Sequence, residues 1–92
     1  MVIKYLKRAL IDLNNIAEYI ALDNPEAAKK VITGLKISID LLLSTPNIGR
    51  SGRVNGTREL IKSHYIIPYR IVKYEIQILR VFDTSQKPPK QW

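Results

Sequence analysis

The stretch Arg58–Phe82, RELIKSHYIIPYRIVKYEIQILRVF, decides the fold of this chain. β-Branched and aromatic residues recur in it with a period of two, which is typical of β-strands. A tight turn at Lys73-Tyr74 separates its last two runs. The stretch therefore predicts a meander of three strands: Arg58–Lys62, His64–Val72 and Glu75–Phe82.

Alternation along the middle strand separates two sets of side chains. One set is Tyr65, Ile67, Tyr69 and Ile71, and the other is Ile66, Pro68 and Arg70. The first set is more apolar and is predicted to face the core, which would turn Arg70 to the open face. Since proline has no N–H to donate, Pro68 predicts an edge position or a bulge. The alternative for the basic residues is cross-strand pairing, of Arg70 and Arg80 with Glu59 or Glu75.

The first half of the chain has the pattern of one strand and two helices. Val2–Tyr5 predicts an opening strand, and from Leu6 to Ile20 apolar residues recur every three or four positions, as on one face of a helix. Asn24-Pro25 indicates a second helix start, with Asn as the N-cap and Pro at the first helical position. This helix should stop at Ser44-Thr45-Pro46. Gly34 inside it predicts close packing against the first helix.

These elements give the order β-α-α-β-β-β, an α+β fold. About three residues join the helices, so we expect an antiparallel helical hairpin on one face of a mainly antiparallel four-stranded sheet. The glycines of the loop Pro46–Gly56 match no phosphate-binding fingerprint and are predicted to form turns. The polar stretch 83–92 should leave the sheet and run over the surface as a tail.

Composition limits the possible functions. The 92 residues allow one domain, 1–92, without disulfides or thiol nucleophiles, because the chain has no Cys. No apolar run approaches the ~18 residues of a membrane span, and no secretory segment opens the sequence, so we expect a cytoplasmic protein. Residues 1–46 hold six basic and five acidic residues, whereas residues 47–92 hold nine and three. The second half is therefore the candidate surface for an anionic partner, the alternative being a solvated basic face.

Few residues are suited to catalysis. The chain has one His, its carboxylates form no metal cluster, and we expect neither a metal nor a cofactor. A metal-free site could still cleave RNA, with basic side chains stabilising phosphorane charge and His64 or Tyr65 transferring a proton. As the alternative, His64 is a surface residue at a strand end. A plain nucleic-acid-binding module is less favoured, because neither helix is basic enough to read a major groove.

The chain resembles the RelE/ParE superfamily of toxins from type II toxin–antitoxin systems. The similarity covers nearly the whole chain, and its motifs are specific only together and in this order. They are ALIDLNNIAEYI (9–20), NPEAA (24–28), TPNIGR (45–50), GTREL (56–60), YIIPYRI (65–71) and ILRVF (78–82).

The resemblance implies the same fold and one of two activities. RelE-like members are ribosome-dependent mRNA endonucleases, whereas ParE-like members bind DNA gyrase, trap its cleavage complex and cause growth arrest without being nucleases. Where many RelE-like nucleases have H-x-x-R after the last strand, this chain has Asp83 and Gln86, and Ile66 stands where such a nuclease places an arginine. These differences and the opening motifs favour the ParE-like branch. An inactive or retargeted toxin is a further alternative.

The candidate residues differ between the two activities. For gyrase binding, the predicted contacts are Arg58, Arg70, Arg80, Lys87, Lys90 and Trp92, with Trp92 as an aromatic anchor. For RNA cleavage they are His64, Tyr65, Arg70 and Arg80.

The resemblance also implies a cognate antitoxin. An acidic segment of this partner would fold on binding and cover the helical hairpin and the sheet. The residues predicted to bind it are Leu10, Leu13, Ala17, Ile20, Arg50 and Arg53.

Overall fold

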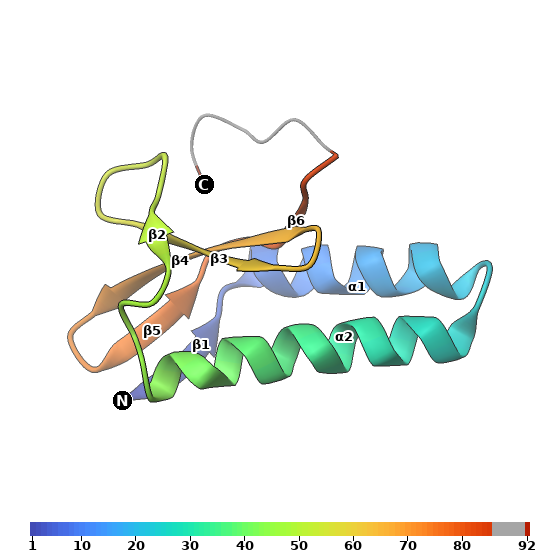
Figure 1. Cartoon of the computed structure of the whole chain (residues 1–92), viewed down its shortest axis with the longest axis horizontal. Coiled ribbons are helices and arrows are strands. Elements are labelled where there is room, and N and C mark those ends of the chain that lie inside the picture. The colour runs from blue at the N-terminus through green and yellow to red at the C-terminus, as the bar shows by residue number, and fades with distance from the viewer. Residues whose placement is uncertain (86–91) are drawn as a thin grey trace.

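The computed structural model describes residues 1–85 and residue 92. Strand β1 (Val2–Tyr5) leads into two antiparallel helices, α1 (Lys7–Ala21) and α2 (Pro25–Asp40), which lie side by side along one face of a sheet (Figure 1). A short 3-10 helix, η1 (Leu41–Leu43), continues α2. The remaining elements are β2 (Arg50–Ser51), β3 (Arg58–Lys62), β4 (Tyr65–Val72), β5 (Glu75–Ile78) and β6 (Phe82–Asp83).

The predicted α+β fold with its helical hairpin is confirmed. Asn24 caps α2, because its side chain accepts hydrogen bonds from the backbone N–H groups of Glu26 and Ala27, each at 3.1 Å. The sheet has the order β1-β5-β4-β3-β2, with β6 also paired to β4. Only the β1–β5 pair is parallel, so the sheet is mainly antiparallel as predicted. It has six strands rather than four, since β2 was missed and the predicted strand Glu75–Phe82 is divided into β5 and β6.

The core lies between the hairpin and the sheet. Tyr65, Ile67 and Tyr69 of β4 point into it, as the alternation predicted, and meet the apolar stripes of the helices. Leu13 of α1 and Leu35 of α2 belong to those stripes. Burying these side chains is the main favourable term in forming the two layers. The opposite face of the sheet is called the open face below.

The third predicted strand, Glu75–Phe82, is interrupted. It pairs with β4 as far as Tyr69↔Ile78, and pairing resumes one residue out of register at Ile66↔Phe82. Between these points Pro68 offers only a carbonyl, which accepts a hydrogen bond from the Leu79 N–H at 2.9 Å. The bulge that Pro68 predicted therefore lies in the partner strand. The alternative of an edge position is wrong, because β4 lies inside the sheet.

Three local expectations also need correction. The loop 46–56 contains β2, which pairs with β3. Of its glycines, only Gly56 has a positive φ, +80°, whereas a Cβ on Gly49 would lie 2.7 Å from the Tyr69 hydroxyl oxygen. Close approach is thus the reason for Gly49. Gly34 has the opposite outcome: a Cβ there would meet nothing within 4 Å, so it does not mark close helix packing.

Candidate functional site

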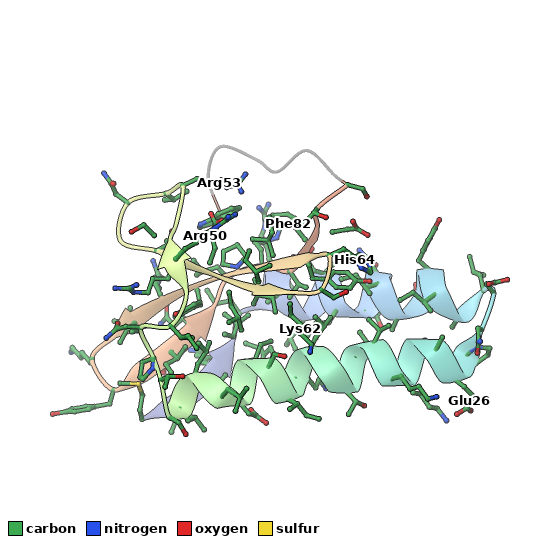
Figure 2. The ribbon with its side chains drawn as sticks, in the orientation of Figure 1. Glu26, Arg50, Arg53, Lys62, His64 and Phe82 are labelled. Atoms are coloured by element: carbon green, nitrogen blue, oxygen red, sulfur yellow. The ribbon has the colours of Figure 1, made fainter. Side chains whose placement is uncertain are left out.

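A buried carboxylate organises two arginines on the open face. Glu59 of β3 is 2% exposed and lies 3.0 Å from Arg50 Nη2, while its other oxygen accepts hydrogen bonds from Arg53 Nε and the Arg53 backbone N–H, both at 3.0 Å. Burial alone would raise the pKa of Glu59, but the hydrogen bonds from Arg53 and Arg50 together hold it below its usual value. Figure 2 shows Arg50 and Arg53 on the side of the sheet away from the helices.

A second carboxylate holds Arg80. Asp12 of α1 accepts hydrogen bonds from Arg80 Nε at 2.8 Å, from Arg80 Nη2 at 3.1 Å and from the Val81 N–H at 2.9 Å. The side chains of Arg80 and Asp12 are only 18% and 13% exposed. The contact fastens the bulge after β5 to helix α1. The alternative, in which Arg80 forms a cross-strand pair with Glu59 or Glu75, is therefore wrong.

Arg70 and Arg58 occupy different environments. Arg70 is exposed on the open face, as predicted, and its Nε donates to Gln77 Oε1 at 2.6 Å rather than pairing with a carboxylate. Arg58 donates from Nη1 to the Gly49 carbonyl at 2.8 Å and to the Asn47 carbonyl at 3.2 Å. Arg58 therefore braces the loop, and Arg70 presents its charge to solvent.

The residues proposed for proton transfer lie at one end of β4. The His64 ring stacks near Tyr65, with ring centroids 4.2 Å apart, and His64 Nε2 lies 3.8 Å from Asp83 Oδ2. Burial, and then the charge of Asp83, raise the pKa of the Tyr65 hydroxyl. Hydrogen bonds from Ser85 lower the pKa of Asp83. At about 3.3 Å per residue, Arg70 lies about 20 Å along the strand from His64.

Two adjoining clefts follow helix α1. The first has a volume of about 480 Å³, lies between α1 and the β6 end of the sheet, and brings Tyr65 and Arg80 together. The second, of about 600 Å³, lies at the tip of the hairpin. Both are lined by Tyr19 and Ile20, and the two adjoining clefts are together called the groove below. Its apolar residues, among them Ile16, Ile20 and Leu22, fit a peptide segment with apolar side chains, and Asp12, Asp23 and Asp83 add acidic groups to its walls.

The residues predicted to bind an antitoxin are dispersed. Leu13 belongs to the core, Ala17 and Ile20 are partly buried, and Leu10 is exposed. Arg50 and Arg53 lie on the other side of the sheet, with Glu59. The sequence prediction missed Tyr19 and Leu22, which are 77% and 87% exposed and line the groove. Their signal was available, because both are large apolar residues beside the core-facing stripe of α1.

The remaining expectations concern the tail, a metal or cofactor, and a membrane-spanning segment. Lys87 and Lys90 lie outside the described residues, while Trp92 packs against Phe82 with ring centroids 5.4 Å apart. Within residues 1–85 and 92, no group of three His, Asp or Glu side chains could hold a metal ion. No helix in that part of the chain is long and apolar enough to cross a membrane. This arrangement offers basic side chains on the open face and a groove with both apolar and acidic residues.

Nearly the whole chain matches a known family. A model described as the ParE toxin of type II toxin–antitoxin systems (parDE) matches residues 3–88. The Sinorhizobium fredii protein Y4kP, which bears a toxin name, is 40% identical over 90 residues, covering 96% of this chain and 93% of the relative. Toxin RelE2 of Caulobacter vibrioides is 31% identical over 74 residues, covering 80% and 84%. This chain belongs to the ParE toxin family, and it is a type II toxin of the ParE/RelE superfamily.

Solved structures agree with this membership. A chain from the chromosomal ParDE system of P. aeruginosa superimposes with a TM-score of 0.79 at 31% identity, covering 90% of this chain and 95% of that one. A chain of the RelBE2 toxin–antitoxin complex from Mycobacterium tuberculosis gives a TM-score of 0.61 at 22% identity, covering 89% and 95%. The second similarity establishes the fold alone.

Proposed function

We propose that this toxin binds DNA gyrase, traps its cleavage complex and so blocks replication, without cleaving RNA itself. The observation that carries the proposal is the dispersal of the side chains that RNA cleavage would need. Arg80 is neutralised by Asp12, and Arg70 lies about 20 Å from His64 along β4. One phosphate cannot contact both Arg70 and His64. Membership in the ParE family supports the same activity.

The target-binding surface in this proposal is the open face with the tail. Arg70 contributes an exposed charge at its centre, and Lys87 and Lys90 would add charge from the tail, outside the described residues. Such a surface favours contact with an anionic region of a gyrase–DNA complex through charge complementarity. Binding to gyrase places the site of action in the cytoplasm, where the chromosome is.

The test is a gyrase reaction with purified toxin, ATP and supercoiled plasmid. We expect linear DNA that requires both gyrase and the toxin. Arg70→Ala should reduce the linear product, while Lys29→Ala, which removes an exposed charge from the opposite helical layer, serves as the matched control. Linear DNA in the absence of gyrase, or none in its presence, would contradict the proposal.

One observation favours RNA cleavage as a second candidate. Tyr65 and Arg80 line the same cleft, as a proton-transfer group and a phosphate-binding group would. Here Tyr65→Phe should abolish mRNA cleavage in a translating extract while leaving the fold unchanged. If the wild-type toxin leaves mRNA intact in that extract, this second candidate is excluded.

We also propose that a cognate antitoxin binds the groove along α1. Its apolar anchors would cover Tyr19 and Leu22, and its acidic residues would meet the exposed side of Arg50. Saturating antitoxin at about 100 times its Kd should stabilise the toxin by about 2.7 kcal/mol. Equal melting temperatures of the toxin with and without the antitoxin would contradict this proposed interface.

The groove itself can be tested by substitution. Leu22→Ala should weaken binding of the antitoxin, because a large apolar side chain is lost from the interface. Ile37→Ala removes an exposed apolar residue of α2 that lines neither cleft and is the matched control. Equal losses of affinity from both substitutions would place the interface elsewhere.

A further inference from the structure

Trp92, the last residue of the sequence and its single Trp, lies against the open face of the sheet. Three groups hold its indole. The ring packs on Phe82, with centroids 5.4 Å apart, and the Arg53 guanidinium lies 5.6 Å from the centre of the ring. The indole N–H donates to Thr57 Oγ1 at 3.2 Å. The contacts come from β6 and from the loop after β2, so the indole bridges two parts of the fold.

The space that the indole occupies is called the slot below. Its side formed by the loop after β2 is held by contacts that do not involve Trp92. The Thr57 hydroxyl donates to the Val54 carbonyl at 2.6 Å, which leaves its lone pairs to accept from the indole N–H. Gly52 lies against Thr57, and a Cβ there would collide with Thr57 Oγ1. Glu59 fixes Arg53 through its side chain and its backbone N–H. The slot is therefore set up to receive an indole.

The other side of the slot is equally fixed. Arg80 lies over the opposite end of the stack, with its Cζ 4.6 Å from the centre of the Phe82 ring, and Asp12 holds Arg80. The side chains thus form a series, Arg80–Phe82–Trp92–Arg53. Cations favour the faces of aromatic rings, and aromatic pairs favour centroid distances of this size. In Figure 2, Arg53 and Phe82 lie on the same side of the sheet, away from the helices.

We propose that Trp92 is a latch that closes on the open face and must open before the toxin engages its target. The inference rests in part on the proposed function, together with the expectation from the sequence that Trp92 is an aromatic anchor for gyrase. An indole packed between Phe82 and Arg53 cannot be inserted into a partner at the same time. The closed indole also covers Phe82 and Arg53, so neither of these side chains can contact the target while the latch is closed.

The closed latch can be measured through Trp fluorescence, because Trp92 is the only source. We expect acrylamide to quench the folded protein much less than the free peptide TSQKPPKQW, which spans residues 84–92. Thr57→Val keeps the shape of residue 57 but loses the hydroxyl that accepts the indole hydrogen bond. The ratio of closed to open molecules should therefore fall by about fivefold. Thr57→Ser retains the hydroxyl and is the matched control.

Two quenching results would overturn the latch. One is equal quenching of the wild-type protein and the peptide, which needs no variant and so does not depend on whether Thr57→Val folds. The other is protection that disappears on dilution, which would mean that Trp92 occupies the slot of a second copy. Circular dichroism melting of each Thr57 variant confirms that the comparison is made on folded protein.

The link to activity has its own readout. At limiting toxin, Thr57→Val should increase linear DNA in the gyrase reaction by about fivefold, in line with the opened fraction, while Thr57→Ser should match the wild type. Unchanged or reduced linear DNA from an opened variant would overturn the gating role. If the wild-type toxin yields no linear DNA at all, the gyrase proposal has failed. The latch is then tested only by acrylamide quenching of Trp92 fluorescence.

Discussion

Two carboxylates in this small basic protein hold arginines in different ways. Asp12 reaches Arg80 across 68 residues and joins helix α1 to the sheet, with both side chains largely buried. Glu59 is only 2% exposed, but its partners Arg50 and Arg53 lie within nine residues and remain 58% and 36% exposed. The Asp12 pair fastens two layers together, whereas the Glu59 cluster shapes one loop on the open face.

The difference bears on which arginines can bind a partner. An arginine enclosed with its carboxylate has few hydrogen-bond donors left, and its charge is cancelled at short range. The Glu59 cluster carries two arginines for one carboxylate and keeps a net positive charge at the surface. Arg70, whose hydrogen bond is to neutral Gln77, contributes a full charge to the open face. Surface binding of anions therefore belongs to the open face rather than to Arg80.

The largest expected effect comes from Asp12→Asn. It leaves Arg80 charged, mostly buried and unpaired, so we expect a loss of about 3 kcal/mol in the free energy of unfolding. For a domain of this size that loss lowers Tm by about 15 °C. Glu18→Gln, on the exposed side of the same helix, is the control and should change Tm little. A loss no larger than that of the control would remove the difference between the two clusters.

A smaller effect is expected from Glu59→Gln. The two arginines lose their common carboxylate, but both can turn to water, so we expect about 2 kcal/mol, measured by urea unfolding. Glu75→Gln on β5 is the matched control, because Glu75 accepts one hydrogen bond from Gln77 and is less buried. If Glu59→Gln proved more damaging than Asp12→Asn, the loop rather than the layer contact would be the stabilising element.

The lowered pKa of Glu59 gives the cluster a pH dependence. A carboxylate whose pKa is lower in the folded state stabilises the protein above its unfolded pKa, and this contribution is lost as pH falls through the folded value. Stability should therefore decline below pH 4.5, the unperturbed value for Glu59. In melting curves between pH 7 and pH 3, Glu59→Gln should flatten this decline. Parallel curves for the two proteins would assign the acid sensitivity to other carboxylates.

The smallest effect on stability is expected from Arg70→Ala. Its side chain is exposed and its only described hydrogen bond is to Gln77, so Tm should change by about 2 °C or less. In the gyrase reaction the same substitution should reduce linear DNA. A variant that melts like the wild type yet loses activity would separate binding arginines from structural ones. Lost stability together with lost activity would place Arg70 in the structural group.

Local patterns predicted the main elements of the fold because their causes are local. The Asn24-Pro25 signal marked the start of α2, and the alternation in β4 identified which side chains face the core. Both depend on residues within a few positions of one another. The break after Ile78 was not predicted, because it depends on Pro68 across the ladder and on Asp12 binding the Val81 N–H.

The site was less predictable than the fold. Every basic residue in the second half looked equally available in the sequence, since charge alone does not name a partner. The structure divides these residues according to the acceptor that each one meets: Asp12 for Arg80, Glu59 for Arg53, and backbone carbonyls for Arg58. The groove beside Tyr19 also arises only when α1 lies next to β6.

The sequence by itself determined the two-layer α+β architecture, the helical hairpin and the toxin family. These follow from periodicity, capping and motif order, which depend on the order of residues along the chain. Only the tertiary structure decided which arginines are neutralised, where the groove runs, and that Trp92 lies on the open face. Those properties depend on pairs such as Asp12 and Arg80 or Thr57 and Trp92. Their separation in sequence is large, and only the packing of helices and strands brings them within hydrogen-bonding distance.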